Sequence, residues 1–585
     1  MVKRKDNAVQ YSNRYGSYKS CYQGRRIYYN RGGIDGPNTV LIVLFQDGNT
    51  LYPDESIKQD IPAALPATAP ELPPPARLSR WQKIWHWEYT GLVIIILVTL
   101  GFHFAAVERP PTIVWDEKWY VGDARSIITG GGEVRPEHPP LAKLFVVTGE
   151  YLFNGFKVPE KDTGAALINR INTTATVIDV SDASAINVGD NIRIDREQLN
   201  VTGVFKDTNQ ISVERDVGGT GLYEHNRDAR VYVFTDNPWG WRIFSILFGT
   251  LGIVVFYFIC RKLKFTLRTS LIATFLFAFE DMTFLHSSFA LLDVYMVTFM
   301  LVAVLLYLNE NYMLSGIFVS LSAQCKLVGV LILIAMFLHF AIYRRDKWLP
   351  FVSSLLVAAV SYVFFIFIFD YFMTGSLENP ITRIIAMLNG TSANVFSVPK
   401  LSIACYPWTW IYPQFVQLYY NSPNVPFIVY AYNPQAISFI SSTIQIVIVP
   451  TVGYLIYKMA KGNQTAGLLV FWFLATYVIW IPLVLITNRV TFVFYFLPTT
   501  PAICIGIAMA MTDILGWLKN KRERAGRTTA GVKAWYGVLG FYLLLHLAIF
   551  VVLNPAIPPL IKTWLPPFSI GVDPTVALIT LMNCV

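Results

Sequence analysis

Long apolar runs separated by short polar segments occupy most of the chain from residue 89 onward. A membrane-spanning helix needs about 20 mainly apolar residues. The segments that approach this length are 89–107, 240–261, 269–287, 289–308, 312–326, 327–343, 349–370, 436–457, 465–486, 490–515 and 534–554. The pattern predicts a mostly α-helical, polytopic membrane protein with about 11 transmembrane helices.

A second pattern, in which apolar and polar residues alternate, appears between the first two predicted spans. Such alternation is typical of half-buried strands separated by turns. The five predicted strands are 174–180, 191–195, 199–204, 210–214 and 230–234. They predict a small β-barrel or sandwich over residues 161–236. We interpret this module as an insertion, because the flanking sequence reads as one unit without it.

Four clusters of Lys and Arg follow the second, sixth, eighth and tenth predicted spans, at 261–268, 344–347, 458–461 and 519–524. Short basic loops favour the cytoplasmic side of a membrane. All four clusters are cytoplasmic if the N-terminus is cytoplasmic, which places the C-terminus outside. Two large outer loops then remain, 108–239 and 371–435. Chemistry at the outer face is expected there.

The remaining boundaries follow from composition. Residues 1–80 are polar and end in a Pro/Ala-rich stretch, so we expect a disordered cytoplasmic tail with a stiff linker. Residues 81–160 hold the first span and a catalytic outer loop. Residues 237–555 hold the remaining helical bundle, and 556–585 form an outer tail.

Composition narrows the class of protein. Of the 585 residues, 54% are hydrophobic and 15% are charged, which favours a lipid environment. The net charge of +9 comes from short runs beside apolar segments rather than from a basic stripe, so nucleic acid is not an expected partner. The six cysteines lack metal-ligand spacing and predict neither a zinc site nor a disulfide framework.

Two short motifs in the first outer loop carry candidate chemistry. Residues 115–120 read WDEKWY and place Asp116 beside Glu117. Residues 135–143 read RPEHPPLAK, in which paired prolines fix the backbone where an amphipathic segment begins. Each motif alone also fits solvated loop charges or a polar helix cap. Together, in this order and about twenty residues apart, they indicate a site.

With these motifs the chain resembles the dolichyl-phosphate-mannose protein O-mannosyltransferase family, which has an Asp-Glu pair followed by His-Pro-Pro-Leu-(Gly/Ala)-Lys. The resemblance extends over most of 89–515. Its further parts are Glu280, Leu291-Leu292-Asp293, the segment 316–329 with Cys325 and Lys326, Tyr406-Pro407-Trp408-Thr409-Trp410, and Arg489 with Phe494, Tyr495 and Pro498.

The chain also departs from the family. Ser288 stands where the family usually has Arg, and Leu327 replaces the usual Trp. No His precedes the Pro-Trp-x-Trp motif, and the second outer loop is too short for the β-trefoil of eukaryotic members. These departures favour a prokaryotic or divergent member in the plasma membrane.

The resemblance implies a GT-C-like glycosyltransferase. Such an enzyme moves a sugar, mannose in the family, from a polyprenyl- or dolichyl-phosphate carrier to a protein Ser/Thr hydroxyl at the outer face. One catalytic base suffices for direct displacement with inversion, unlike the two-carboxylate retaining scheme. Asp116 is the candidate base, with Glu117 in support.

The leaving phosphate requires cations, for which the candidates are Lys326, Arg489, Arg135 and Lys143. The other candidate substrate-binding residues are His138, Asp293, Trp408, Trp410 and Tyr495. No cofactor is required beyond the lipid-linked donor as substrate. A divalent metal held by Asp116, Glu117 and His138 stays open, although their spacing does not demand one.

Three other functions are alternatives. The acceptor could be a lipid or a glycan instead of a protein. The chain could be an inactive homologue that serves as a membrane complex or surface subunit, with the β-insertion as the surface for a membrane protein partner. A transporter is disfavoured, because no inverted repeat or paired broken helices are visible.

Overall fold

The computed structural model describes residues 88–108, 111–114, 116–392, 395–396, 404–411, 417–418, 437–438, 440–525 and 530–553, together with short strands before residue 44. Two compact units, Met1–Trp81 and Gln82–Val585, divide the chain. In the first, β1 (Lys3–Lys5) pairs with β2 (Ala8–Gln10), and β3 (Tyr18–Tyr22), β4 (Arg25–Asn30) and β5 (Leu41–Val43) form a second antiparallel sheet. The expected linker and the outer tail 556–585 lie outside the described residues.

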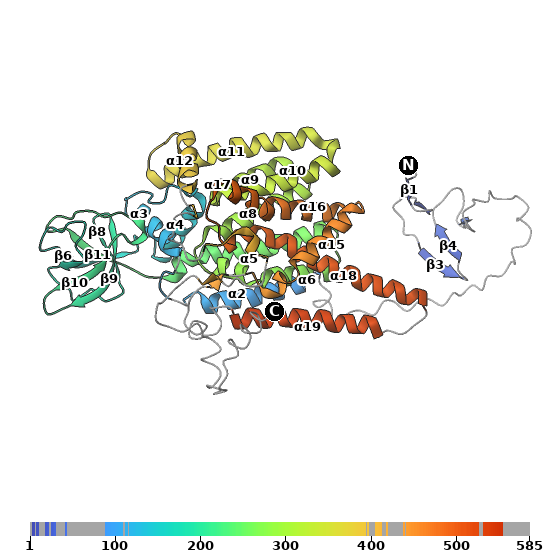
Figure 1. Cartoon of the computed structure of the whole chain (residues 1–585), viewed down its shortest axis with the longest axis horizontal. Coiled ribbons are helices and arrows are strands. Elements are labelled where there is room, and N and C mark those ends of the chain that lie inside the picture. Colours follow the sequence, from blue (N-terminus) through green and yellow to red (C-terminus); the bar gives the residue numbers. More distant parts are fainter. Residues whose placement is uncertain are drawn as a thin grey trace, which may run out of the picture. The chain divides into compact units, whose positions relative to one another are not determined.

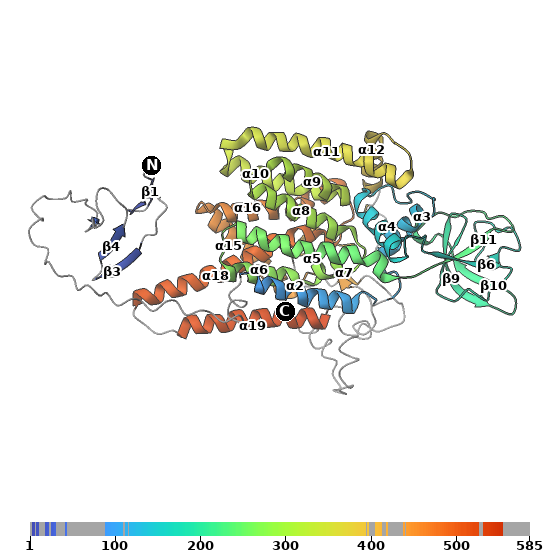
Figure 2. The same ribbon diagram turned by 180° about the vertical axis from the view of Figure 1, so that it is seen from behind.

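The second unit is a bundle of helices with a β-module attached to it. In Figure 1, α5, α8, α9 and α11 run side by side along the long axis, and Figure 2 shows the same order from behind. The α-helices are α2 (Thr90–Ala106), α3 (Glu117–Ile128), α4 (Leu141–Phe153), α5 (Pro238–Lys262), α6 (Leu267–Ala278), α7 (Asp281–Ser288), α8 (Leu292–Leu308), α9 (Tyr312–Cys325), α10 (Ile332–Tyr343), α11 (Trp348–Thr374), α12 (Pro380–Ser392), α14 (Ser442–Gln445), α15 (Ile448–Ala460), α16 (Gln464–Phe473), α17 (Trp480–Thr487), α18 (Thr500–Ala525) and α19 (Ala530–Leu553). Shorter helical turns are η2 (Val217–Gly219), η3 (Leu327–Leu331) and η7 (Val493–Thr499).

Apolar helices confirm a multi-pass membrane protein. Five helical stretches are long and apolar enough to cross a bilayer: Pro238–Lys262, Arg345–Thr374, Gln464–Thr487, Val493–Lys521 and Ala530–Val551. The bent pair α7 and α8 supplies a sixth if it is one span, and five shorter apolar helices of 10–17 residues accompany them. Each predicted span overlaps one of these helices. The number eleven stays a prediction, because the shorter helices do not reach the usual length.

One predicted span, 269–287, is wrong as a continuous helix. Helix α6 ends at Ala278, and Glu280 caps a separate helix α7 by accepting a hydrogen bond from the Thr283 amide at 2.7 Å. The chain then bends by 113° between α7 and α8. This bend places Asp293 in the first turn of α8, where a negative charge is favoured by the helix dipole.

The alternating segment forms a six-stranded antiparallel sheet in the order β6-β11-β8-β9-β10-β7. The strands are β6 (Glu160–Ala166), β7 (Val177–Asp179), β8 (Asn191–Ile194), β9 (Glu197–Phe205), β10 (Gln210–Glu214) and β11 (Arg230–Phe234). Two backbone hydrogen bonds join the edge strands β6 and β7. The Ile168 amide donates to the Asp179 carbonyl, and the Ser181 amide donates to the Ala166 carbonyl. The predicted small β-fold is confirmed as a barrel-like closed sheet.

The barrel has a hydrophobic core of its own, made of inward-facing Ile, Val and Leu residues that are buried. Sequence reasoning missed only β6. Its residues, EKDTGAA, do not alternate, and Gly164 interrupts the strand with a φ of 78°.

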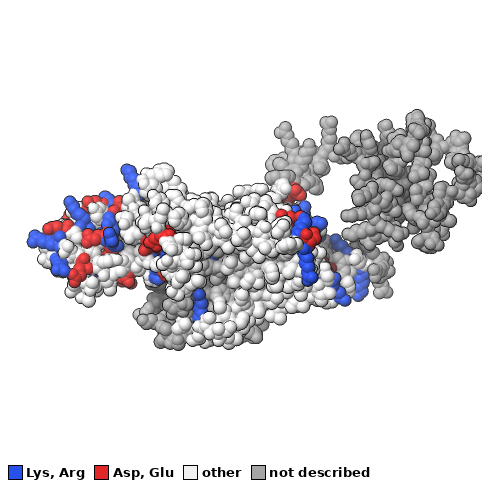
Figure 3. All heavy atoms as spheres, turned by 90° about the horizontal axis from the view of Figure 1, so that it is seen from above, with Lys and Arg blue, Asp and Glu red and all other residues white. Residues whose placement is uncertain are grey.

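Charged side chains avoid the middle of the bundle. On the face that Figure 3 shows, Lys, Arg, Asp and Glu gather over the barrel and at the opposite end of the bundle, with an uncharged zone between them. This distribution is typical of helices embedded in a bilayer, where charges are costly.

The predicted orientation can be tested by cysteine labelling in a cysteine-free background. We expect a membrane-impermeant maleimide to label Ser184→Cys, which is exposed on the barrel, in intact cells. Lys519→Cys, in the basic cluster after the tenth predicted span, is expected to react only after permeabilisation. Labelling of Lys519→Cys in intact cells would reverse the assigned orientation.

Candidate active site

Asp116 lies at the N-terminus of α3, directly after the first membrane helix. Its carboxylate is half-buried, and among the described residues none donates a hydrogen bond to it. Burial raises the pKa of Asp116 to about 6, with the negative charge of Asp293 adding to the effect and the positive charge of Lys326 opposing it. A carboxylate with free lone pairs and a pKa close to neutral is suited to accept a proton.

Lys326 and Asp293 form an ion pair beside Asp116. The Lys326 Nζ lies 2.8 Å and 2.9 Å from the two carboxylate oxygens of Asp293. It also lies 4.7 Å from the ring centre of Phe494 and 5.3 Å from that of Tyr495. Lys326 occupies this position because α9 ends at Cys325 and the backbone of Lys326 is extended. Since an ammonium has three donors and Asp293 takes two, one donor remains for another ligand.

Two arginines carry buried nitrogens without acceptors. The Nε atoms of Arg135 and Arg489 are buried and have no hydrogen-bond partner among the described residues. The Arg135 guanidinium stacks 3.8 Å from the ring centre of Trp119, and its Nη1 lies 3.1 Å from Glu137. Buried donors are normally satisfied. Among the described residues, the Nε atoms of these two guanidiniums therefore each keep a donor that an anion could accept.

His138 lies near several cationic side chains of the site. Burial lowers the pKa of His138 well below its usual range. The positive charges that lower it further are those of Lys143, Lys326, Arg135 and Arg489. Its ring lies edge-on to Tyr120, with 5.7 Å between ring centres. His138 is therefore a neutral imidazole at pH 7, able to hydrogen-bond without adding charge.

Glu117, predicted to support Asp116, is engaged with other parts of the protein. Its side chain is fully buried and pairs with Arg242, at 2.8 Å to Nε and 2.7 Å to Nη2. It also accepts hydrogen bonds from the Val114 and Ala290 amides. All its usual acceptor positions are used. Glu117 therefore anchors the start of α3 to α5 and to the turn before α8.

Lys143, predicted to bind the leaving phosphate, is paired with carboxylates of the protein instead. It is fully buried, 2.8 Å from Asp123 and bonded to Glu133, so it is not available to a phosphate. Glu133 also pairs with Arg383 of α12, which donates to the Pro136 carbonyl at 2.7 Å. This buried network fixes the loop that carries Arg135 and His138. Arg242 and Arg383 were missed from sequence, because their partners lie 125 and 250 residues away.

The two tryptophans of the Pro-Trp-x-Trp motif have different surroundings. Trp410 is fully buried, with its ring 6.4 Å from that of Tyr495, so it presents no exposed face, and its contact with substrate stays a prediction. Trp408 is 37% exposed and stacks on Tyr406 at 4.6 Å, which in turn stacks on Phe396 at 4.3 Å. Only Trp408 of the pair presents a ring to a ligand.

The departure at Ser288 has a structural explanation. Ser288 is buried, and its Oγ donates to the Phe284 carbonyl at 2.9 Å and lies 3.0 Å from the Nδ1 of His103. His103 also stacks on the Phe284 ring. Ser288 therefore contributes to the contact of α7 with α2 and does not face Asp116.

The barrel is docked on the helix that begins at Asp116. A Cβ added to Gly122 of α3 would lie 2.7 Å from the Gly218 Cα, so both glycines are needed for this contact. The Gln198 side chain donates to the Gly122 carbonyl at 2.8 Å. A Cβ on Gly219 would lie 3.2 Å from the Arg135 Nε. The turn of η2 thus contacts both α3 and the Arg135 side chain.

The structure brings together Asp116, Asp293, Lys326, Arg135, His138, Arg489 and Tyr495. Within the part of the chain that the structure describes, no three His, Cys, Asp or Glu side chains are grouped to hold a metal ion.

Part of the chain matches a known family. Residues 215–376 match the dolichyl-phosphate-mannose-protein mannosyltransferase family. The match covers less than half of the chain and includes the predicted motifs at Glu280, Leu291-Leu292-Asp293 and Lys326. The resemblance inferred from the motifs is confirmed. No sequence among curated proteins matches the chain.

One solved structure shares the fold, and others are more distantly similar. The S. cerevisiae protein O-mannosyltransferase Pmt1-Pmt2 complex bound to the sugar donor has a TM-score of 0.55 at 11% identity, over 82% of this chain and 92% of that one. The Archaeoglobus fulgidus oligosaccharyltransferase scores 0.45 at 12% identity, over 82% of this chain and 57% of that one. ArnT from Cupriavidus metallidurans bound to undecaprenyl phosphate has a TM-score of 0.39 at 13% identity, over 80% of this chain and 77% of that one. The likeness to the Pmt1-Pmt2 structure concerns the fold of the helical bundle alone.

Proposed function

We propose that this protein is a membrane glycosyltransferase that moves a sugar, mannose by family, from a polyprenyl-phosphate carrier to a protein Ser/Thr hydroxyl at the outer face of a prokaryotic plasma membrane. The observation that carries the proposal is the carboxylate of Asp116, which has no hydrogen-bond donor among the described residues and lies near the cations Lys326 and Arg135, with Arg489 near the neighbouring His138. A base and a phosphate site are the two requirements of this transfer. The mannosyltransferase domain and the donor-bound Pmt1-Pmt2 structure support the choice of donor.

The proposed reaction is a direct displacement. The acceptor oxygen forms a bond to the anomeric carbon while the bond from that carbon to the phosphate oxygen breaks. The hydroxyl proton moves to Asp116, and the lipid phosphate leaves with its negative charge stabilised by the Lys326 ammonium and the Arg489 guanidinium. Attack from the side opposite the phosphate inverts the anomeric centre. Asp293 positions Lys326 and takes no proton.

The experiment is a transfer assay with purified full-length protein. We expect polyprenyl-phosphate-linked mannose with a Ser/Thr-containing peptide to yield a glycopeptide of inverted configuration. Parallel reactions replace the peptide with a glycan or a lipid acceptor and mannose with glucose. Transfer only to a glycan or lipid would refute the protein acceptor. Failure with every donor, combined with undetectable donor binding, would favour the inactive-subunit alternative.

The contact between barrel and α3 gives a matched pair of variants. Gly164 and Gly218 both have left-handed φ, of 78° and 73°, so alanine adds similar backbone strain of about 1–2 kcal/mol at each. Only at Gly218 does the new methyl meet α3, at 2.9 Å from the Gly122 Cα, whereas nothing lies within 4 Å at Gly164. We expect Gly218→Ala to lower turnover about 10- to 100-fold by displacing α3.

Gly164→Ala is expected to keep wild-type turnover. Hydrogen exchange of the α3 amides is the readout that does not depend on activity, and it is expected to accelerate only in Gly218→Ala. Equal turnover and equal exchange in the two variants would show that the barrel does not position the helix.

A further inference from the structure

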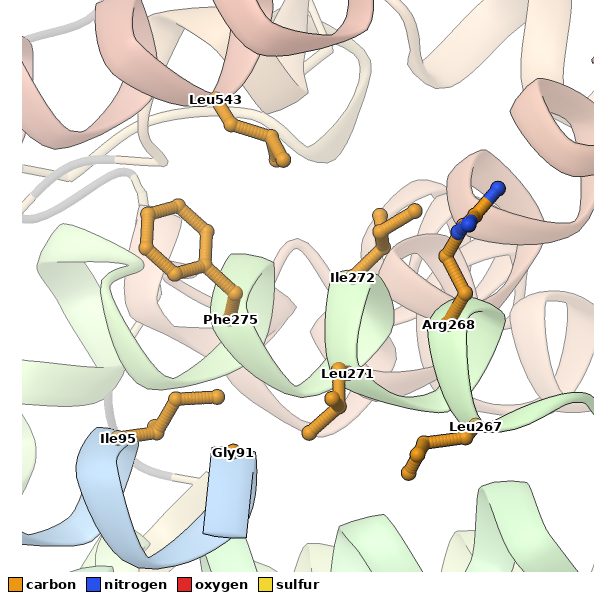
Figure 4. Close-up of a pocket in the computed structure, with 8 residues that line it drawn as sticks. All are labelled: Gly91, Ile95, Leu267, Arg268, Leu271, Ile272, Phe275 and Leu543. Carbon is orange, nitrogen blue, oxygen red and sulfur yellow. The ribbon is translucent and has the colours of Figure 1, made fainter. Parts of the chain in front are cut away.

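A groove lies between α2, α6 and α19, on the outside of the bundle. Its volume is about 570 Å³, and apolar side chains from all three helices line it, including Ile95, Leu271, Phe275 and Leu543. Figure 4 shows these side chains around the groove, with Arg268 as the charged residue among those that line it. The α2 helix approaches closely here because residue 91 is glycine: a Cβ would lie 2.6 Å from Leu271. An open apolar groove on a membrane helix bundle is filled by an acyl chain in a bilayer.

Cations without acidic partners mark one end of the groove. The exposed Arg268 donates from Nη1 to the Tyr536 hydroxyl at 2.5 Å, and its guanidinium lies 5.2 Å from that ring's centre. The Lys519 Nζ lies 5.9 Å from the same ring. Among the described residues, no carboxylate forms an ion pair with Arg268 or Lys519. Two cations without an acidic partner among the described side chains, with a hydroxyl between them, provide the donors that a phosphate ester accepts.

Arg268 also lies at a helix end that attracts anions. It lies in the first turn of α6, where the helix dipole favours an anion and disfavours a cation. An anionic group at this point would be stabilised by the side chain and by the helix terminus together. The neighbouring basic residues Lys262 and Lys264 are exposed and add to the positive potential.

The groove is separate from the candidate active site. Gly91 and Ile95 belong to the N-terminal turns of α2, whereas Asp116 follows the C-terminal end of that helix. A helix of 17 residues is about 25 Å long, so the two sites lie near opposite faces of the membrane. The lipid-linked donor at Asp116 therefore does not reach this groove with its phosphate.

We propose that the groove is a binding site for an anionic phospholipid of the leaflet beside the basic clusters, the cytoplasmic leaflet in the predicted topology. One acyl chain lies along Ile95, Leu271 and Phe275, and the headgroup phosphate is bound by Arg268 and Lys519. Binding at this point joins α19 to α2 and α6 and stabilises the bundle.

The test uses full-length protein purified in detergent, with phosphatidylglycerol and phosphatidylcholine as probes in native mass spectrometry and thermal unfolding. We expect saturable binding and an upward Tm shift with phosphatidylglycerol only. Arg268→Gln and Lys519→Gln are each expected to weaken binding about fivefold, as for one cation at an anionic lipid surface. Leu543→Trp is expected to reduce binding by filling the groove.

Lys461→Gln is the matched control, since Lys461 is an exposed cation in another basic cluster and does not line the groove. It is expected to bind phosphatidylglycerol as the wild type does. Equal binding of both lipids, or equal weakening by Lys461→Gln and Arg268→Gln, would overturn the site. Displacement of phosphatidylglycerol by polyprenyl phosphate at lower concentration would show that the occupant is instead the carrier lipid.

Discussion

Asp116→Asn is expected to lower turnover by about 10²–10⁴-fold, the usual loss when a general base is removed. Asparagine keeps the size of the side chain but cannot accept the acceptor's proton. Donor affinity is expected to change little, because the phosphate is assigned to cations on other segments. The measurement is turnover and donor Kd for each variant in the same membrane preparation, with folding checked by thermal unfolding.

Arg489→Gln is expected to show the opposite balance between turnover and donor affinity. Its guanidinium has a buried, unpaired Nε, so its loss is expected to raise the donor Kd more than it lowers turnover at saturating donor. If Asp116→Asn transferred sugar at a near wild-type rate, the base would be a different group. Asp293 would then be the next candidate, since Glu117 has no free acceptor position.

The pH profile gives an independent check on the base. Burial raises the pKa of Asp116 to about 6, and the carboxylate must be deprotonated to act. The wild-type rate is therefore expected to fall as the pH drops below about 6. The residual activity of Asp116→Asn is expected to lack this limb. An unchanged low-pH limb in the variant would assign it to another group.

Arg242→Gln is expected to cost about 3–5 kcal/mol of stability, because it leaves the buried Glu117 charge without its partner. Both side chains are at most 1% exposed, and Arg242 also donates to the carbonyls of Val107 and Thr112. The measurement is thermal unfolding and expression yield in a membrane fraction. Turnover is expected to fall as well, since α3 begins at this pair.

Arg170→Gln is the control for this variant. Arg170 pairs with Glu224 on the barrel surface, with side chains 67% and 52% exposed, so its loss is expected to cost no more than about 1 kcal/mol. A stability loss of similar size in the two variants would mean that the Glu117–Arg242 pair does not hold α3.

Local patterns along the chain were enough to predict much of the fold. Runs of apolar residues indicated the helices, because a helix in lipid satisfies its backbone within one segment. Alternation indicated five of the six strands of the barrel, since side chains of a strand point to opposite faces in turn. The motif around Asp116 and the later motifs pointed to the family, and residues 215–376, which hold the motifs around Asp293 and Lys326, match it.

Tertiary structure decided what those patterns left open. Asp116 and Glu117 are adjacent carboxylates in the sequence, yet Arg242 of α5 buries Glu117 and leaves Asp116 available. Likewise, Asp123 and Glu133 enclose Lys143, whereas Lys326 keeps one donor free beside Asp293. Local sequence determines which residues can form helices, strands and charges. Which charge is free and which is paired depends on partners more than a hundred residues away, and only packing brings those together.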